Sequence, residues 1–232
     1  MHVFYAPDIE TTAVLPEEES HHAVRVLRLE VGATIQIVDG KGGVFLGIIA
    51  VADAKRCLIN SLQAQTVAYR RPYYLHVAIA PTKNMDRLEW FVEKAAEIGI
   101  DEISPLYCRY SERKNLKTER LQRILVSAMK QSIQPTLAVL NEPTTFKEWI
   151  KHVDADQKFI AHCHDSEKQF LASAIQPGKK VLIMIGPEGD FSEQEVETAI
   201  QLGFQPVGLG RSRLRTETAG VVACHTAVLL NE

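Results

Sequence analysis

The sequence predicts an α/β protein in two parts, a small N-terminal β-barrel and a larger domain with a parallel sheet covered by helices. Two observations lead to this prediction. Residues 1–68 contain short apolar runs separated by glycine-rich turns, with one amphipathic helix among them. Residues 74–232 alternate between strand-like and helix-like segments, which is typical of a parallel sheet. The segment 67–73, with two arginines and a proline, is the expected linker.

The N-terminal part is expected to contain strands at 2–5, 34–39, 44–51 and 57–62. The glycine-rich stretch between the second and third runs predicts a hairpin turn. Residues 17–28 are the exception, because Ala23, Val26 and Leu27 fall at helical spacing, with acidic residues at the start and arginines at the end. A helix is therefore expected there, ended by Gly32.

The C-terminal part is expected to contain strands at 74–80, 102–107, 158–163, 181–185 and 204–210, and helices at 86–98, 116–132 and 218–230. A further helix should begin at Ser192, because Glu195 follows at capping-box spacing. The helix at 86–98 places an apolar stripe on one face and is closed by Gly99: Leu88, Phe91, Val92, Ala95 and Ala96.

The helix at 218–230 is apolar on nearly every face, so it must be buried on more than one side. Two readings remain open. It is either a central core helix of the domain or part of an interface between subunits.

Composition excludes several classes of protein. The 232 residues are 46% apolar, as in an ordinary globular protein, and no run of about 18 apolar residues predicts a membrane helix. The N-terminus lacks the features of a signal peptide, and the four cysteines include no CxxC pair, so a cytoplasmic protein with reduced thiols is expected. A net charge of −3 argues against a nucleic-acid binder that is basic throughout.

Two glycine-bearing loops are the candidate functional features. Gly186-Pro187-Glu188-Gly189 follows an apolar strand but lacks the lysine of a phosphate-binding loop. Gly208-Leu209-Gly210 begins like a dinucleotide fingerprint, but Arg213 replaces its third glycine. The residues alone therefore leave two readings, a site where the backbone approaches a flat ligand and a pair of structural turns.

Basic residues form two groups. Arg211, Arg213 and Arg215 alternate in the second loop and indicate an anion or an RNA backbone, unless they pair with Glu188 and Asp190 in solvent. The second group, with Tyr107 and Tyr110 available for stacking, is either RNA-binding or an exposed helix face: Arg109, Arg113, Lys114, Lys117, Arg120 and Arg123.

Metal binding and nucleophilic catalysis are not expected. The pair His21 and His22 and the group at 162–164 lack the spacing of metal ligands. No Gly-x-Ser-x-Gly elbow is present, and Cys163 has no evident base nearby in the sequence.

Four motifs together resemble one bacterial family. They are Ile185 to Gly189 with Phe191, Ser192 and Glu195; Leu209 to Ala219; the spaced residues His22, Val26, Leu27, Arg28 and Gly32; and the spaced residues Lys83, Asp86, Arg87, Glu89, Lys94, Glu97 and Gly99. The chain resembles the 16S ribosomal RNA (uracil-N3)-methyltransferase family, RsmE, of the SPOUT class. Two residues depart from that pattern: Asp190 stands where a glycine is usual, and Gln134 where arginine is frequent.

The resemblance implies a PUA-like RNA-binding barrel, a SPOUT domain with a trefoil knot, a homodimer, and S-adenosylmethionine as methyl donor. It assigns the cofactor site to Ala161, His162, Ile185, Gly186, Glu188, Gly189, Leu209, Gly210, Leu214, Thr216 and Thr218. Asp190 is expected to reshape its loop, because a residue with a side chain tolerates a positive φ less well than glycine.

The implied reaction methylates uracil N3 of a uridine in the 16S rRNA of the 30S subunit. Arg215 is expected to stabilise negative charge on the uracil, with Glu217 as a base or as the residue that orients Arg215. RNA contacts are expected at Arg25, Arg28, Arg109, Arg113, Lys114, Arg211 and Arg213. The alternatives are a SPOUT enzyme that acts on another RNA and a non-catalytic protein that binds RNA or assembles ribosomes.

Overall fold

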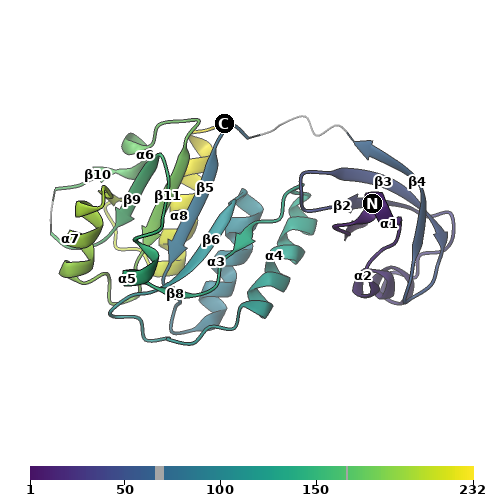
Figure 1. The fold of residues 1–232 in the computed structure, drawn as a ribbon, viewed down its shortest axis with the longest axis horizontal. Helices are drawn as coiled ribbons and strands as arrows, with labels where there is room; N and C mark the ends of the chain where they lie inside the picture. The colour runs from purple at the N-terminus through teal and green to yellow at the C-terminus, as the bar shows by residue number, and fades with distance from the viewer. Residues whose placement is uncertain (66–70, 166) are drawn as a thin grey trace. The chain divides into compact units, whose positions relative to one another are not determined.

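The computed structural model describes residues 1–65, 71–165 and 167–232 (Figure 1). The chain forms two compact units. The first comprises residues 1–70 with 126–137, and the second comprises 71–125 with 138–232. Residues 67–70 of the expected linker lie outside the described residues, so a division into independent domains at 67–73 stays a prediction.

The first unit is built on a four-stranded sheet in the order β1-β2-β3-β4. Its strands are β1 (Val3–Tyr5), β2 (Thr34–Val38), β3 (Val44–Val51) and β4 (Leu58–Gln65). The expected hairpin is confirmed, since β2 and β3 pair antiparallel from Val38↔Val44 outward. Alternate residues of β2, Ile35 and Ile37, point into the core with Phe4 and Ile49.

The helical segment of this unit differs from the expected one in detail. It consists of α1 (Ile9–Thr12), α2 (Glu17–His21) and a π-helical turn, η1 (His22–Val26). The wider turn shifts the register of the apolar residues that fall at helical spacing, so Ala23 is buried while Val26 is 59% exposed. The helix ends at Val26, Arg28 follows it in the left-handed conformation (φ 54°), and Gly32 instead lies in the turn that leads to β2.

Residues 126–137 also belong to the first unit, which the sequence did not predict. Lys130 donates a hydrogen bond to Glu19 over 2.6 Å, and the backbone N–H of Gly42 donates to Pro135 O. These contacts join residues more than ninety positions apart, and no local pattern reports them.

The second unit contains a parallel sheet in the order β10-β12-β9-β11-β5-β6-β7, with β8 also paired to β6. Every pair in it is parallel, as predicted. The strands are β5 (Tyr74–Ile79), β6 (Glu102–Tyr107), β7 (Val139–Leu140), β8 (Thr144–Thr145), β9 (Gln157–Ala161), β10 (Gln169–Phe170), β11 (Lys180–Ile185) and β12 (Gln205–Gly208). The two-residue strands β7, β8 and β10 are too short for a sequence pattern to reveal.

Helices cover both faces of this sheet (Figure 1). They are α3 (Met85–Ile98), α5 (Phe146–Trp149), α6 (Leu171–Ala174), α7 (Glu193–Gln201) and α8 (Thr216–Leu229). A further helix, α4 (Thr118–Ser132), begins in this unit and ends in the first. Side chains of α5 and α7 pack with Leu182 and Met184 of β11 in one core. Helix α8 packs against α3, β5 and β11.

Local signals place α3 and α7 where they were predicted. The apolar stripe of α3 is buried as expected, and Gly99 closes the helix in the left-handed conformation (φ 105°). Ser192 and Glu195 form both hydrogen bonds of a capping box at the start of α7. Helix α8 begins at Thr216, two residues before the expected start.

Helices α3 and α8 meet at a glycine. A Cβ atom at Gly220 would lie 2.6 Å from the ring of Phe91, so the two helices approach as closely as they do only because this residue has no side chain.

A buried polar cluster lies near the amino ends of β5 and β6. His76 Nε2 is 2.8 Å from Ser104 Oγ, and Asn141 donates to Ser104 Oγ and to Glu102. His76 is only 5% exposed. Burial lowers the pKa of His76 to about 4, although Glu102 opposes this shift and Lys180 adds to it. The imidazole is therefore neutral in the folded protein near pH 7.

Acid should destabilise the second unit through His76. The unfolded chain binds this proton below about pH 6.5 and the folded chain only below about pH 4, so stability falls as the pH drops between these values. We expect a loss of about 2 kcal/mol by pH 5. Urea unfolding followed by tryptophan fluorescence reports on this unit, since both tryptophans, Trp90 and Trp149, lie in it.

The variant His76→Gln removes the titrating group and should flatten the pH dependence of the unfolding free energy. The pH dependence that remains comes from other histidines. An unchanged slope between pH 7 and pH 5 in the variant would show that His76 does not carry the effect.

Candidate active site

Three loops meet at the carboxyl edge of the parallel sheet. Strand β9 pairs with β11 on one side and with β12 on the other, in parallel register. The loops that follow these strands, at 162–168, 186–192 and 209–215, therefore leave the sheet at the same edge.

The loops enclose a pocket of about 340 Å³. Eight residues expected to bind cofactor, substrate or RNA line it: Ala161, Ile185, Gly186, Glu188, Arg213, Leu214, Arg215 and Thr216. Sequence reasoning missed four others that line it, Cys163, Pro187, Asp190 and Ala219. Pro187, Asp190 and Ala219 lie within the two loop motifs or directly beside them, and this position in the sequence could have marked them as site residues.

Side chains hold the pocket in shape. Thr216 Oγ1, at the start of α8, donates a buried hydrogen bond to Gly186 O over 3.1 Å. Glu188 Oε1 accepts from the backbone N–H of Lys83, while its Oε2 atom is buried without a partner. A Cβ atom at Gly186 would lie 3.0 Å from the Phe191 ring, so a side chain there would push into the buried ring.

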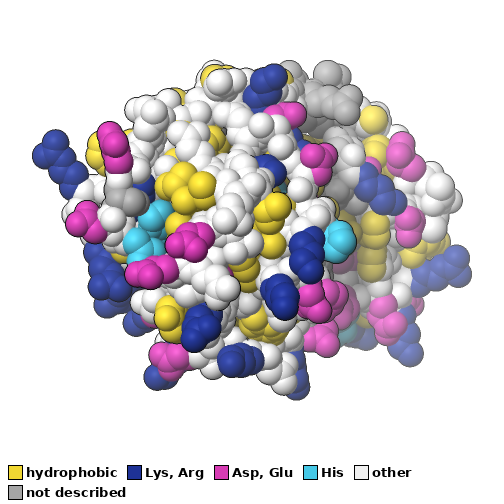
Figure 2. All heavy atoms as spheres, turned by 60° about the vertical axis from the view of Figure 1, so that its left-hand side comes forward, with side chains coloured by type: hydrophobic (Ala, Val, Ile, Leu, Met, Phe, Trp, Pro, Cys, Tyr) yellow, Lys and Arg dark blue, Asp and Glu magenta, His cyan; other side chains and the backbone are white. Residues whose placement is uncertain are grey.

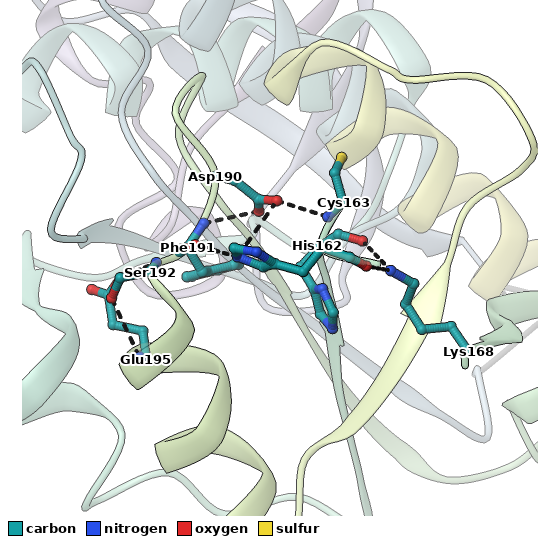
Figure 3. A network of polar contacts seen from close by, with 8 residues as sticks. His162, Cys163, Lys168, Asp190, Phe191, Ser192 and Glu195 are labelled. Atoms are coloured by element: carbon teal, nitrogen blue, oxygen red, sulfur yellow. Dashed lines mark hydrogen bonds and ion pairs between the residues drawn. The ribbon is translucent and has the colours of Figure 1, made fainter. Parts of the chain in front are cut away.

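Asp190 joins two of the loops (Figure 3). Its Oδ2 atom accepts from the backbone N–H of Cys163 over 2.7 Å, and its Oδ1 atom accepts from the N–H of Phe191. The residue has φ 66°, in the left-handed region that favours glycine. The cost of that conformation is offset by the hydrogen bonds of its carboxylate, which a glycine could not make.

The loop after β9 is held by Lys168 and His164. Lys168 donates to the carbonyl oxygens of His162 and His164. His164 Nε2 lies 2.6 Å from the carbonyl oxygen of Phe191, which can only accept, so this nitrogen carries the proton. Figure 3 shows Lys168 and Asp190 joined through the backbone of the loop at 162–164.

His162 is buried in this loop, and neither of its ring nitrogens has a hydrogen-bond partner. Burial lowers its pKa to about 4, and the nearby Lys168 cation adds to the effect. The ring is therefore neutral near pH 7.

Six residues expected to bind the cofactor or to act in catalysis do not line the pocket: His162, Gly189, Leu209, Gly210, Glu217 and Thr218. Gly189 packs against Tyr110, where a Cβ atom would lie 2.9 Å from the tyrosine side chain. Glu217 is buried, and its Oε1 atom lies 3.7 Å from Arg87 Nε of α3. The structure thus gives Glu217 an arginine partner other than the expected Arg215.

The residues expected to bind RNA separate into groups. Arg211 is exposed beside the pocket, and Arg25 and Arg28 are exposed in the first unit. Arg113 donates to the carbonyl oxygens of Thr82 and Lys83 and so has a structural role.

Other basic residues of the group between 109 and 123 differ in their surroundings. Arg120 pairs with Glu89 at 2.7 Å, as in an exposed helix face. Arg109 and Lys114 instead line a second pocket of about 970 Å³.

Metal ligands and membrane-spanning helices are both absent from the residues that the structure describes. Within 1–65, 71–165 and 167–232, no three His, Cys, Asp or Glu side chains gather in a way that could hold a metal ion. No helix in these ranges is both long and apolar enough to cross a membrane.

Comparison with known proteins identifies the family. Residues 70–228 match the RNA methyltransferase domain family, and residues 15–60 match the RNA methyltransferase PUA domain. The chain belongs to the RNA methyltransferase family. A relative from Synechocystis, named ribosomal RNA small subunit methyltransferase E, is 30% identical and aligns over 93% of this chain and 72% of its own length.

Solved structures of RNA methyltransferases share the whole fold. A probable rRNA-methyltransferase from Porphyromonas gingivalis is 41% identical, with a TM-score of 0.90 and coverage of 100% of this chain and 98% of its own. Ribosomal RNA small subunit methyltransferase E from Neisseria gonorrhoeae, bound to S-adenosyl methionine, is 27% identical, with a TM-score of 0.86 and the same coverage.

Replacing Asp190 should loosen the loops of this methyltransferase. In Asp190→Ala, both backbone N–H groups lose their acceptor while the left-handed conformation remains unfavourable, so we expect a loss of about 2 kcal/mol in unfolding free energy. Asp190→Asn keeps an acceptor oxygen and tolerates this conformation, so it should lose less. Urea unfolding and amide hydrogen exchange at Cys163 measure both effects. Equal exchange rates at Cys163 in the wild type and Asp190→Ala would contradict the assignment.

Proposed function

We propose that this protein transfers a methyl group from S-adenosylmethionine to N3 of a uridine in the 16S rRNA of the small ribosomal subunit. The observation that carries the proposal is the pocket that the three loops form in a chain of the RNA methyltransferase family. The names of the relatives support the small-subunit RNA, and the gonococcal relative bound to S-adenosyl methionine supports the methyl donor.

The pocket fits this donor chemically. Its volume of about 340 Å³ is in the range of small-molecule sites. The unpartnered Glu188 oxygen suits a ligand that carries positive charge and hydroxyl groups, as S-adenosylmethionine does. In this proposal Ala161, Ile185, Gly186, Glu188, Leu214 and Thr216 hold the donor, while Gly189, Leu209, Gly210 and Thr218 shape the surrounding loops. His162 supports the loop after β9 from its buried position.

The chemistry requires an activated nitrogen. When bound, S-adenosylmethionine supplies a methyl group on a positively charged sulfur. Uracil N3 carries a proton near neutral pH and is a poor nucleophile until that proton is lost, in this proposal to solvent water. Arg215 lines the pocket at the start of α8, and in this proposal its guanidinium stabilises the negative charge that then develops on the uracil carbonyl oxygens. Glu217 positions the first turn of α8 through Arg87.

The test of the function is transfer of labelled methyl from S-adenosylmethionine to purified 30S subunits, followed by mapping of the modified nucleotide. Methylation at N3 of a uridine in 16S rRNA supports the proposal. Methylation of another RNA alone would assign the enzyme to a different substrate, and no transfer to any RNA would refute the activity.

Arg215→Ala should reduce kcat about 100-fold or more, because a charged donor to the reacting base is lost. Binding of S-adenosylmethionine, measured by calorimetry, should stay within about threefold, and Arg215→Lys should recover part of the rate because it restores the charge without the planar fork. Full methyl transfer by a correctly folded Arg215→Ala variant would remove Arg215 from the mechanism.

The finer details of the fold belong to the same proposal. A trefoil knot in the second unit is supported by the sheet order, which inserts β11 between β9 and β5, and by the return of Thr216 to the loop after β11. Closure of the first unit into a barrel is supported by the bridge between Val14 and Leu58 on β4.

The two remaining proposals concern assembly and location. Helix α8 buries one side, with Ala223 and Cys224, but leaves Leu229 61% exposed, and Trp90 of α3 is also exposed. These apolar side chains support a homodimer through α3 and α8, which sedimentation would show as twice the 25.9 kDa mass of one chain. A cytoplasmic location follows from a ribosomal substrate.

A further inference from the structure

A second pocket begins where the first one ends along the chain. Asp190 lines the loop pocket, and Ser192, two residues later, lines a pocket of about 970 Å³. Because two residues span at most about 7 Å, the walls of the two pockets are close. The second pocket lies between α5, one side of α7 along its whole length and the residues at the end of β6 and after it, all within the second unit.

This pocket combines an apolar lining with a basic rim. Its apolar lining comes from Leu202, which is exposed, and from the edges of Cys108, Phe146 and Ile150, which are at most 6% exposed. Four of its five charged residues are basic and exposed: Arg109, Lys114, Lys147 and Lys151. Figure 2 shows a face of the molecule on which Lys and Arg side chains lie along the lower part, with hydrophobic and acidic side chains between them.

The charge of this rim is not neutralised within the described part of the chain. No ion pair among the described residues involves Arg109, Lys114, Lys147 or Lys151. The one acidic residue of the lining, Glu195, is occupied, because it accepts hydrogen bonds from Ser192 and from the backbone N–H of Arg109.

Nearby cations differ from those of the rim. Lys83 pairs with Glu112, and Arg120 pairs with Glu89. Four cations without an acidic partner among the described residues therefore surround this one opening.

We propose that this pocket is a subsite for a nucleotide that neighbours the methylated uridine in the RNA strand. The base lies against Phe146 and Ile150, and the phosphates lie against Lys147 and Lys151 of the rim. Single-stranded RNA is recognised in this manner, with bases splayed onto apolar or aromatic side chains and the backbone held by cations. This subsite rests on the proposed function, because its neighbour is the pocket in which the uridine reacts.

Two features favour an RNA strand over a free small anion. The cations are exposed and spread around an opening, as suits a chain of phosphates, whereas a small anion is usually held by donors that converge at one point. Arg109 lies over the ring of Tyr110 at 5.9 Å, and Tyr110 is half exposed, so a planar pair is available for stacking at the rim.

The test compares three variants of the full chain as methyltransferases on 30S subunits. The double variant Lys147→Gln/Lys151→Gln removes two rim charges on exposed side chains. Gln201→Trp fills the pocket from α7 without changing its charge. Lys179→Gln removes an exposed lysine just before β11, at the opposite edge of the sheet, and is the matched control.

The double variant should raise KM for 30S subunits about tenfold at physiological salt, with kcat and S-adenosylmethionine binding within about twofold. The slope of log(kcat/KM) against log salt should fall by about 1.4, or about 0.7 for each phosphate that is no longer neutralised. Gln201→Trp should raise KM by a similar factor with an unchanged salt slope, and Lys179→Gln should match the wild type. Thermal unfolding confirms that each variant is folded.

Three outcomes separate the inferences. If KM and the salt slope of the double variant equal those of the wild type, the subsite is wrong although the proposed function stands. If the double variant raises KM but Gln201→Trp does not, the cations form a diffuse attractive surface and the pocket is not a subsite. If the wild type methylates no RNA, the proposed function itself fails.

Discussion

The hydrogen bond from the Cys163 N–H to the Asp190 carboxylate is the constraint on which the candidate site depends. Parallel register brings the ends of β9 and β11 to one edge, but it does not fix the loops that follow. Asp190 fixes them by accepting from one loop while it sits in the other, in a backbone conformation that is unfavourable for a residue with a side chain. Local strain is thus maintained by a contact 27 residues away along the chain.

The third wall of the pocket depends on helix packing on the far face of the sheet. Gly220 lets α8 approach Phe91 of α3, and this approach sets where the first turn of α8 begins. Thr216 then reaches Gly186, and Glu217 reaches Arg87. The position of Arg215 is therefore a consequence of core packing, and its neighbour Thr216 is held by a buried hydrogen bond that solvent does not weaken.

Features that depend on neighbouring residues were predictable from the sequence. The capping box at Ser192, the buried stripe of α3 and the parallel character of the second sheet each follow from spacing over a few residues. Features that depend on contacts between distant residues could not be predicted from the sequence. The π-helical turn that exposes Val26, the pairing of Glu217 with Arg87, and the packing of residues 126–137 with the first unit all depend on partners that no local pattern specifies.

Which basic residues are free to bind an anion also depends on distant contacts and could not be predicted from the sequence. A net charge of −3 argued against a broadly basic surface, and the sequence alone grouped six cations between 109 and 123 as equals. In the structure, acids and carbonyl oxygens occupy Arg113 and Arg120, whereas Arg109 and Lys114 have no acidic partner among the described residues and share a rim with Lys147 and Lys151. What matters for an anionic ligand is the charge left unpaired at one place, because paired cations contribute little field beyond their partners. A protein with a small net negative charge can therefore present a locally positive surface next to its reactive loops.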